Sequence, residues 1–331
     1  MDLFISCDWG TSNCRLRIVD RVTRQVLAEN LSESGIAAIH QQWQQSNEQR
    51  LSFYQSFLLQ QIRTLSARSA TDTKDYLLII SGMASSSLGM MELPYKELPL
   101  DVAGRLPLDG AGKGFPTMLI PATDNFPHDL LLVSGLRTAN DVMRGEETQL
   151  IGCLADRRTT SGLYIFPGTH SKHALVEDGI LLGFTTYMTG ELFHLLSQNS
   201  ILAGSVTISS FSPDPQHSQS ENLYRQSFEK GVEDSQQTGL LHNAFLVRTN
   251  SLFGRWSKEE NYHYLSGLLI GEELKEIAKA PMPVTIVGGG SQKEYYRLAC
   301  ELLHIPLTAI MDADEALIRG HLQLFDQYRR V

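Results

Sequence analysis

A pattern that occurs twice, once near the start of each half of the chain, limits the possible folds more than any other feature of this sequence. Residues 3–20 consist of an apolar run, a polar turn and a second run in which apolar and polar residues alternate, and residues 162–185 repeat that order. Short strand-like runs joined by a turn that contains Gly predict a β-hairpin. The repetition predicts two related domains; a chance echo is the alternative, because strand–turn–strand patterns are common.

The first of the two turns, from Asp8 to Asn13, has the chemistry of a phosphate or metal site. It offers a carboxylate, two hydroxyl groups, a side-chain amide and a glycine, whose backbone can approach a ligand closely. These groups suit a metal-bound polyphosphate. Taken alone, the turn is interpreted equally well as an ordinary polar hairpin turn.

Length and charge narrow the class of protein. With 331 residues the chain is long enough for two domains, and we place their boundary in the polar, unpatterned stretch 155–161. The predicted domains are residues 1–155 and 156–331, with a last helix that is able to pack back on the first domain. The net charge of −9 argues against a nucleic-acid-binding protein, so an anionic substrate would need local Arg or Lys residues.

The cysteines and the apolar runs indicate the compartment. None of the four cysteines has the CxxC spacing of a zinc site, and we expect them to be small buried thiols in a reducing compartment. No run approaches the roughly 20 apolar residues of a membrane span, and the N-terminus lacks the pattern of a signal peptide. We therefore expect a cytoplasmic protein with neither membrane nor nucleic-acid partners.

The hydrophobic pattern predicts strands and helices along the whole chain. Three antiparallel strands are expected over residues 3–30, whereas residues 89–118 and 203–222 are predicted to be irregular because they are dense in Gly, Pro or Ser. Further strands are expected at residues 76–80, 117–121, 130–134, 162–166, 174–177, 179–185, 283–287 and 307–311, and helices at residues 48–66, 192–197, 223–231, 240–253, 262–278, 292–303 and 313–325.

Three more segments carry polar or small residues next to predicted strands. Residues 81–87 are a candidate ligand-facing edge, or a Gly/Ser loop without a role. Residues 135–149 mix both charge signs and are a candidate active site, or a solvated first helical turn that Asn140 or Asp141 caps. Residues 288–290 are three glycines at a strand-to-helix corner, which either admit a phosphorylated ligand closely or form a plain flexible turn.

The arrangement of these turns resembles the plan of the sugar kinase, heat-shock ATPase and actin superfamily. Within it, the sequence resembles the 2-dehydro-3-deoxygalactonokinase family over essentially the whole chain, from Asp8 to the C-terminal helix. The strings that carry the resemblance occur in this order: DWGTSN, GMASS, DVMRGEETQ, PGTHSKH, YMTGELF and VGGGS. The resemblance implies an α/β fold of two RNase H-like (actin-like ATPase) domains, with mixed β-sheets flanked by helices and a cleft between the domains.

The resemblance also implies an ATP site. The first turn would be a first phosphate loop, in which Asp8 orients Mg²⁺ through water, since Mg²⁺ keeps several of its waters. The turn in the second half would be a second phosphate loop, and the three glycines would be an adenosine loop. The implied ATP-binding residues are Asp8, Gly10, Thr11, Ser12, Asn13, Gly168, Thr169, His170, Gly288, Gly289 and Gly290.

The implied reaction is ATP-dependent phosphorylation of 2-dehydro-3-deoxy-D-galactonate at its C6 hydroxyl, a step of galactonate catabolism. Asp141 is the implied general base, because Asn140-Asp141 is similar to the pair that carries the base in bacterial glucokinases of this superfamily. Glu146 and Glu147 lie close by in the sequence, and either could compete for the role.

The substrate is a carboxylate, so a cation should recognise it. Arg137 and Arg144 are the candidates from the cluster around Asp141, and the alternatives from the first hairpin are Arg15 and Arg17. Other residues that could line the sugar side are Met83, Ser85 and Ser86.

Two other functions stay open on the sequence alone. One is a kinase of the same fold that acts on another sugar or sugar acid, and the other is a non-catalytic nucleotide-dependent switch or sugar sensor. An exposed apolar helix from the region 240–275 could support a homodimer.

Overall fold

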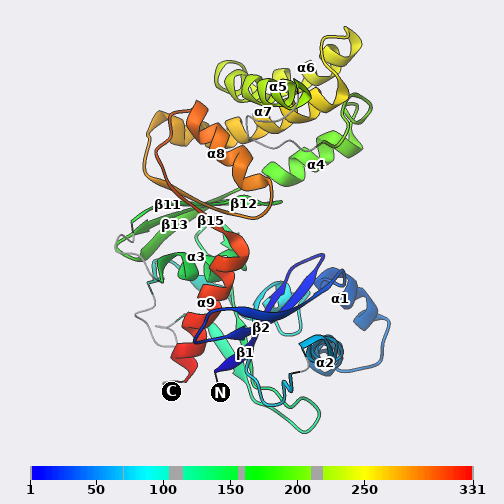
Figure 1. Cartoon of the computed structure of the whole chain (residues 1–331), viewed down its shortest axis with the longest axis vertical. Helices are drawn as coiled ribbons and strands as arrows, with labels where there is room; N and C mark the ends of the chain where they lie inside the picture. The colour runs from blue at the N-terminus through cyan, green and yellow to red at the C-terminus, as the bar shows by residue number, and fades with distance from the viewer. Residues whose placement is uncertain (1, 70, 104–114, 156–160, 210–218, 330–331) are drawn as a thin grey trace. The chain divides into compact units, whose positions relative to one another are not determined.

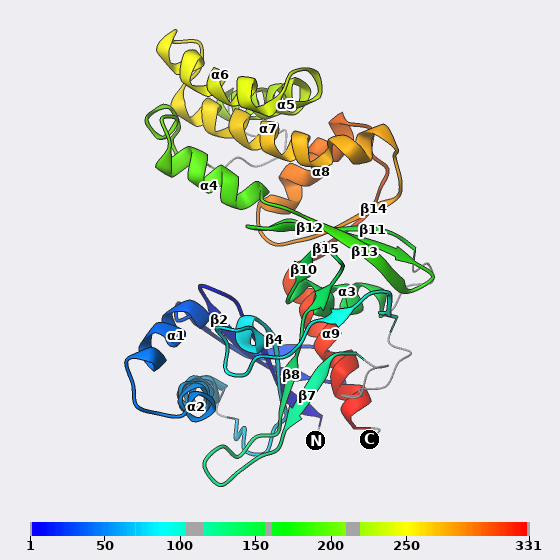
Figure 2. The same cartoon turned by 180° about the vertical axis from the view of Figure 1, so that it is seen from behind.

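The structure is a computed structural model, and it describes residues 2–69, 71–103, 115–155, 161–209 and 219–329. The chain separates into two compact units, which Figures 1 and 2 show from opposite sides. The first unit comprises Met1–Ser161, Val176–Gly183 and Ala313–Val331, and the second comprises Gly162–Leu175 and Phe184–Asp312. Most of the predicted boundary stretch 155–161 lies outside the described residues, and the domain limits at 155 and 156 stay a prediction.

A six-stranded sheet with a parallel centre and antiparallel edges forms the middle of the first unit. Its strands in spatial order are β3 (Val26–Ser32), β2 (Cys14–Asp20), β1 (Leu3–Trp9), β4 (Leu78–Gly82), β8 (Leu130–Val133) and β7 (Thr117–Ile120). β1, β4 and β8 run parallel, and the outer pairs are antiparallel. The three-stranded antiparallel start is therefore confirmed. Every residue of β4 is buried, as expected of a strand covered on both faces.

Alternate residues of β1 point to opposite faces of the sheet, and helices cover both faces. Ile5 and Trp9 share a core with α2 (Arg50–Ser69), where Trp9 stacks on Phe57 with ring centroids 5.2 Å apart. On the other face, Phe4 stacks on Phe325 of α9 (Ala313–Tyr328), the red helix beside β1 in Figure 1.

The helices α3 (Glu146–Leu154) and α9 cross with their backbones in contact. A Cβ atom on Gly152 would lie 1.8 Å from the carbonyl oxygen of Ala316, and one on Gly320 would lie 2.0 Å from that of Thr148. Only glycine leaves room for this approach. Although α9 comes last in the described chain, it is an integral part of the first unit.

The second six-stranded sheet holds the other strand–turn–strand pattern. Its strands in spatial order are β15 (Leu307–Asp312), β14 (Val284–Gly288), β11 (Gly162–Phe166), β12 (Ser171–Glu177), β13 (Ile180–Tyr187) and β6 (Leu100–Asp101). β11 and β15 are parallel to β14. A small third sheet joins β10 (Val142–Met143), β9 (Leu136–Arg137) and β5 (Lys96–Glu97).

The second unit also carries a layer of helices, two of which pack unusually closely. The helices are α4 (Thr189–Asn199), α5 (Gln219–Gln237), α6 (Leu240–Leu252), α7 (Lys258–Lys279) and α8 (Gln292–Leu302). Where α5 meets α7, a Cβ atom on Gly231 would lie 2.2 Å from the carbonyl oxygen of Tyr264, and one on Gly267 would lie 2.1 Å from that of Phe228.

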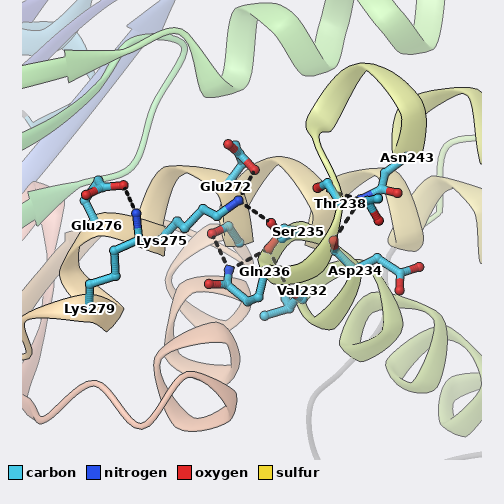
Figure 3. Close-up of polar contacts among 11 residues, drawn as sticks. Val232, Asp234, Ser235, Gln236, Thr238, Asn243, Glu272, Lys275, Glu276 and Lys279 are labelled. Atoms are coloured by element: carbon cyan, nitrogen blue, oxygen red, sulfur yellow. Dashed lines mark hydrogen bonds and ion pairs between the residues drawn. The ribbon is translucent and has the colours of Figure 1, made fainter.

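Side chains from α6 and α7 close the C-terminal end of α5 (Figure 3). Asn243 Nδ2 donates hydrogen bonds to the carbonyl oxygens of Asp234 and Thr238 at 2.8 and 3.1 Å, and Lys275 Nζ donates to that of Ser235 at 2.8 Å. These donors reach carbonyl groups of the last helical turn, where the backbone supplies few N–H partners; the carbonyl oxygen of Asp234 also accepts from Thr238 N at 3.3 Å. The ammonium charge of Lys275 also suits the negative end of the helix dipole.

Local predictions fail at four places, one of which is the stretch 89–118, predicted to be irregular but holding β5 and β6. The helix predicted to begin at Asn140 or Asp141 begins at Glu146, because residues 142–143 pair with β9 instead and Gly145 turns the chain at a φ of 112°. The pattern does not predict α1 (Ile36–Gln44). The stretch 203–222 holds a short 3-10 helix at Ala203–Ser205, and α5 already begins at Gln219; residues 210–218 lie outside the described residues.

None of the helices in the described part of the chain combines the length and the apolar character that a bilayer crossing needs.

Candidate functional site

The hairpin turn between β1 and β2 is held from behind by a helix that the sequence pattern does not reveal. The backbone N–H groups of Gly35, Ile36 and Ala37, at the start of α1, donate to the carbonyl oxygens of Ser12, Gly10 and Thr11 at 3.0, 3.0 and 3.2 Å. The turn thus satisfies the free N–H groups of the helix. With these three carbonyl oxygens tied to α1, the side chains of Thr11, Ser12 and Asn13 are exposed to solvent.

Asp8 lies at the end of β1, opposite Ser81 of β4 and Arg15 of β2. Burial raises the pKa of the Asp8 carboxyl, and the positive charge of Arg17 partly offsets the effect. Gly82, at a φ of 92°, lets the backbones of β4 and β1 approach closely beside this carboxyl, since a Cβ atom there would lie 2.7 Å from the carbonyl oxygen of Trp9 and 3.6 Å from Asp8 Oδ1. A Cβ atom on Gly145 would in turn lie 3.6 Å from Gly82 Cα, so the start of α3 adjoins the end of β4.

Glu146 and Glu147 follow Gly145 directly and lie in different surroundings. Glu147 is fully buried, and its Oε2 accepts a hydrogen bond from Gly145 N at 2.6 Å. Burial, together with the negative charge of Glu146, raises the pKa of Glu147 to about 8. Glu146 is half-buried, accepts a hydrogen bond from Arg144 N at 3.1 Å, and is close enough to Asp8 to raise the pKa of that carboxyl. Of the two carboxyl groups, that of Glu146 is therefore the one that can face a ligand.

A buried polar network behind Asp8 joins β1, β4, α3 and α9. His321 Nδ1 lies 2.7 Å from Ser6 Oγ, and its Nε2 lies 2.8 Å from Ser81 Oγ. Ser81 Oγ is also 2.7 Å from Thr148 Oγ1. Burial lowers the pKa of His321 to about 3, so the imidazole is neutral and has one donor and one acceptor nitrogen for its two serine partners. The network fixes the two parallel strands that flank the carboxyl of Asp8.

The structure brings two of the predicted substrate residues together. Arg144 Nη1 donates to the carbonyl oxygen of Ser85 at 2.8 Å and also contacts Ser85 Oγ, while its guanidinium lies 4.2 Å from the centroid of the Tyr95 ring. Ser85 is buried and donates to the carbonyl oxygen of Val133 at 2.6 Å, so it holds Arg144 in place. Arg144 Nε is shielded from solvent and has no hydrogen-bond partner among the described residues.

The other arginines considered for the substrate are engaged within the protein. Arg15 Nη1 and Arg17 Nη2 contact Asp314 Oδ2 at 2.7 and 2.8 Å, and Arg17 Nε contacts Glu29 Oε2 at 2.6 Å. Arg137, on β9, forms an exposed ion pair with Glu97. Met83 opens the short 3-10 helix Met83–Ser85 and is half-buried.

Asp141 lies in the turn between β9 and β10. The turn is closed by a hydrogen bond from Thr138 N to the carbonyl oxygen of Asp141 at 2.9 Å, and Asp141 Oδ1 accepts from Val142 N at 2.9 Å. The carboxyl of Asp141 is half-exposed and belongs to the same unit as Asp8 and Arg144.

In the second unit, the turn between β11 and β12 packs against the first turn of α4. A Cβ atom on Gly190 would lie 2.5 Å from the carbonyl oxygen of Gly168, and Glu191 N donates to the carbonyl oxygen of Thr169 at 2.9 Å. The Glu191 carboxylate contacts His170 Nε2 at 2.5 Å. Around Gly168 itself a Cβ atom would meet nothing within 4 Å, so the turn has an open side.

A pocket of about 180 Å³ adjoins this turn within the second unit. It is lined by residues of the turn and of α4, α7 and α8: Gly168, Thr189, Gly190, Phe193, Tyr262, Ser266, Leu269, Ile270, Ser291, Gln292, Tyr295 and Tyr296. The glycines 288–290 lead into α8 directly before Ser291, and Gly290 has a φ of 54° that favours glycine. Aromatic walls with a few polar groups suit a nucleoside. No local motif in the sequence marks Tyr262, Ser266 and Tyr295, because helix positions that line a pocket carry no such signal.

Among the described residues, no group of three or more His, Cys, Asp or Glu side chains could hold a metal ion. A single carboxylate such as Asp8 fits Mg²⁺ bound mainly by water and phosphate oxygens, and does not fit a metal held by protein ligands alone.

Comparisons with known proteins agree on one family. A model of the 2-keto-3-deoxy-galactonokinase family matches residues 8–324. A provisionally named 2-dehydro-3-deoxygalactonokinase of Rhizobium meliloti (strain 1021) is 31% identical, over 96% of this chain and 94% of that protein. The 2-dehydro-3-deoxygalactonokinase of Escherichia coli (strain K12) is 26% identical, over 93% of this chain and 92% of that protein.

Solved structures agree as well. A crystal structure from Sinorhizobium meliloti, of a protein provisionally named 2-dehydro-3-deoxygalactonokinase, covers 99% of this chain and 96% of its own, with a TM-score of 0.78 and 29% identity. A gluconate kinase from Lactobacillus acidophilus has a TM-score of 0.52 at 8% identity over 99% of this chain and 90% of its own, which concerns the fold alone. The predicted α/β fold of the actin-like ATPase type, with mixed sheets flanked by helices, is confirmed.

Proposed function

Because the chain belongs to the 2-keto-3-deoxy-galactonokinase family, we propose that it catalyses the ATP-dependent phosphorylation of 2-dehydro-3-deoxy-D-galactonate to its 6-phosphate. The observation that carries this proposal is the family match over residues 8–324, which includes every residue predicted for the site. The chain is a carbohydrate kinase, and its proposed partner is this small sugar acid, as a step of galactonate catabolism. We also propose that it works in the cytoplasm, which its disulfide-free cysteines support.

The proposed ATP-binding residues lie in three loops. In the first unit, the turn that Gly10 opens would bind the β- and γ-phosphates, with the exposed side chains of Thr11, Ser12 and Asn13 as hydrogen-bond donors. In the second unit, residues 168–170 would bind phosphate, and the pocket beside Gly288, Gly289 and Gly290 would hold adenosine. The open side of Gly168 and the aromatic lining of the pocket support these assignments.

Mg²⁺ is proposed to accompany ATP. Asp8 would hold it through water, since Asp8 lies near the end of β1, opposite Ser81 of β4. When bound, Mg²⁺ supplies charge neutralisation to the phosphates during transfer.

Asp141 is proposed as the general base. Its carboxylate would accept the proton of the C6 hydroxyl as that oxygen attacks the γ-phosphorus. Arg144 would bind the substrate carboxylate, held in place by Ser85, and Met83 and Arg137 would lie beside the sugar acid. The guanidinium of Arg144 contacts the uncharged groups of Ser85 and Tyr95, which supports this choice over Arg15 and Arg17, whose charges are paired with Asp314.

A panel of acceptors in a coupled ADP assay tests the function. We expect ADP release with 2-dehydro-3-deoxy-D-galactonate at a kcat/KM well above that for 2-dehydro-3-deoxy-D-gluconate, gluconate and glucose. Preference for another member of the panel would favour a kinase of the same fold with a different substrate. ATP hydrolysis that no sugar acid changes would favour a nucleotide-dependent switch.

A further inference from the structure

Glu273 is a buried carboxylate in α7 to which no sequence motif points. Its side chain is only 1% exposed, yet four polar groups converge on it. Ser171 Oγ and His173 Nε2 each lie 2.7 Å from Oε1, Tyr296 OH lies 2.6 Å from Oε2, and Thr189 Oγ1 also contacts Oε2. A carboxylate can accept about four hydrogen bonds, so these partners use its full capacity.

The four partners come from the elements that surround the proposed nucleotide site in the second unit. Ser171 and His173 stand in β12, directly after the proposed phosphate turn 167–170. Thr189 begins α4, whose next residues contact Gly168 and Thr169. Tyr296 belongs to α8 and lines the proposed adenosine pocket, as do residues of α7 one turn before Glu273.

A carboxylate shielded from water must keep its hydrogen bonds, because an unsatisfied buried charge is strongly unfavourable. Glu273 therefore ties β12, α4 and α8 together at one point, its carboxylate. Both the turn 167–170 and the wall of the pocket depend on that point, although Glu273 itself does not line the pocket.

We propose that Glu273 is a positioning residue that holds the phosphate turn 167–170 in register with the adenosine pocket, so that the site binds ATP and ADP more tightly than adenosine. The inference rests on the proposed function to the extent that this turn binds phosphate. Glu273 would then set the preference for the phosphorylated ligand without itself contacting the nucleotide.

Glu273→Gln tests the proposal in the full-length protein. The amide keeps the size of the side chain but places an NH2 group against two of the donors, which then separate from it. We expect the Kd for ATP and ADP, measured by titration calorimetry, to rise at least tenfold while the Kd for adenosine changes less than twofold. Glu276→Gln is the matched control, since Glu276 lies one turn further along α7, is exposed and pairs only with Lys279 in Figure 3.

A second pair of variants covers the case in which Glu273→Gln does not fold. Thr189→Val removes one donor to Glu273 and keeps the shape of the side chain, whereas Thr189→Ser keeps the hydroxyl group. Thr189→Val should raise the ratio of the Kd for ATP to the Kd for adenosine, as Glu273→Gln does. Thr189→Ser should show the ratio of the wild type.

A parallel loss of ATP and adenosine binding would overturn the proposal, because a merely structural residue affects both ligands alike. A ratio of the ATP Kd to the adenosine Kd that stays at the wild-type value in both Glu273→Gln and Thr189→Val would also overturn the proposal. These measurements need no acceptor, so they are independent of the acceptor panel. A wild-type chain that binds no ATP would contradict the proposed function itself.

Discussion

Glu146 and Glu147 are consecutive residues in the first turn of α3, yet a rotation of about 100° along the helix sends their side chains to different surroundings. Glu147 turns inward, where burial raises its pKa to about 8, and Glu146 stays half-buried beside Asp8. Sequence spacing treats the two as equal competitors for a base. The structure separates them, because one carboxyl is enclosed by protein and the other is not.

The raised pKa of Glu147 predicts a pH dependence of stability. The folded state keeps the Glu147 proton up to a pH of about 8, whereas the unfolded chain loses it near the ordinary value of 4.5. The stabilising contribution is therefore complete below pH 4.5 and is lost as the pH rises toward 8. Relative to Glu147→Gln, the wild type should lose about 1.4 kcal/mol per pH unit between roughly pH 5 and 7.5.

Urea unfolding of both proteins at several pH values measures this difference. Glu146→Gln serves as the control, since that side chain is not enclosed. A constant difference between wild type and Glu147→Gln across the range would show that Glu147 does not hold its proton in the folded state.

The base assignment predicts a separation of binding from turnover. Asp141→Asn should bind ATP and the sugar acid as before but lose turnover by about 10²–10⁴, the usual contribution of a positioned base. Glu146→Gln, measured alongside in the ADP assay, should keep kcat within about tenfold. If Glu146→Gln loses turnover and Asp141→Asn does not, the base is Glu146.

At the scale of elements, strands and long helices were predictable where the pattern is local. β14 is an apolar run bounded by Pro283 and three glycines, and the periodic apolar face of α7 predicts a helix over 262–278, although not its start after the capping box at Ser257. α1 lacks such signals: its N-cap is Gly35, without a side-chain cap, and its N–H partners lie more than twenty residues earlier in the chain. β10 is equally non-local in origin, because pairing with Leu136 and Arg137 outweighs the helix signal at Asn140.

The candidate site divides in the same way. The turn that begins at Asp8 and the glycines at 288–290 could be found from the sequence, since each is a contiguous string. Tyr95, Glu273 and His321 could not, because each acts through a partner distant in the sequence: Arg144, Ser171 and Ser6 respectively. Such partners become neighbours only when the sheets and helices have formed.

The close crossing of α5 and α7 predicts an intolerant glycine. In Gly267→Ala the new methyl group would lie 2.1 Å from the carbonyl oxygen of Phe228, so the helices must separate. We expect a net loss of about 1–3 kcal/mol in the free energy of unfolding, despite the roughly 1 kcal/mol that alanine gains in a helix. Gly204→Ala is the control, because nothing lies within 4 Å of the new atom. Urea midpoints equal to the wild type for both variants would contradict this view of the crossing.

At the scale of the whole molecule, each unit has its own buried core. One core surrounds Trp9 and α2 in the first unit, and others surround Phe228 and Tyr264 in the second. The predicted homodimer is a separate matter and stays a prediction; on α6, Leu241, Phe245 and Leu252 are exposed.

Separate cores predict separate thermal transitions, of which adenosine should shift one. At a hundred times its Kd, adenosine stabilises the unit that binds it by about 2.7 kcal/mol, or roughly 5–10 °C. In Trp256→Phe the remaining tryptophans, Trp9 and Trp43, report on the first unit alone. The midpoint temperature of their fluorescence transition should not change. The midpoint temperature of the second unit, followed by circular dichroism, should rise. Equal shifts in both signals would contradict separate unfolding.

The hydrogen bond between Ser6 and His321 has a consequence for the order in which the protein is made. The two residues are 315 positions apart. At about 5–20 residues per second, a ribosome adds His321 roughly 15–60 s after Ser6. Through that interval one face of β1, including Phe4, has no α9 to cover it, and the segments of the second unit are completed before α9 is made. The unit whose sheet is translated first is thus the last to finish folding, and newly made chains should be most prone to aggregate through β1.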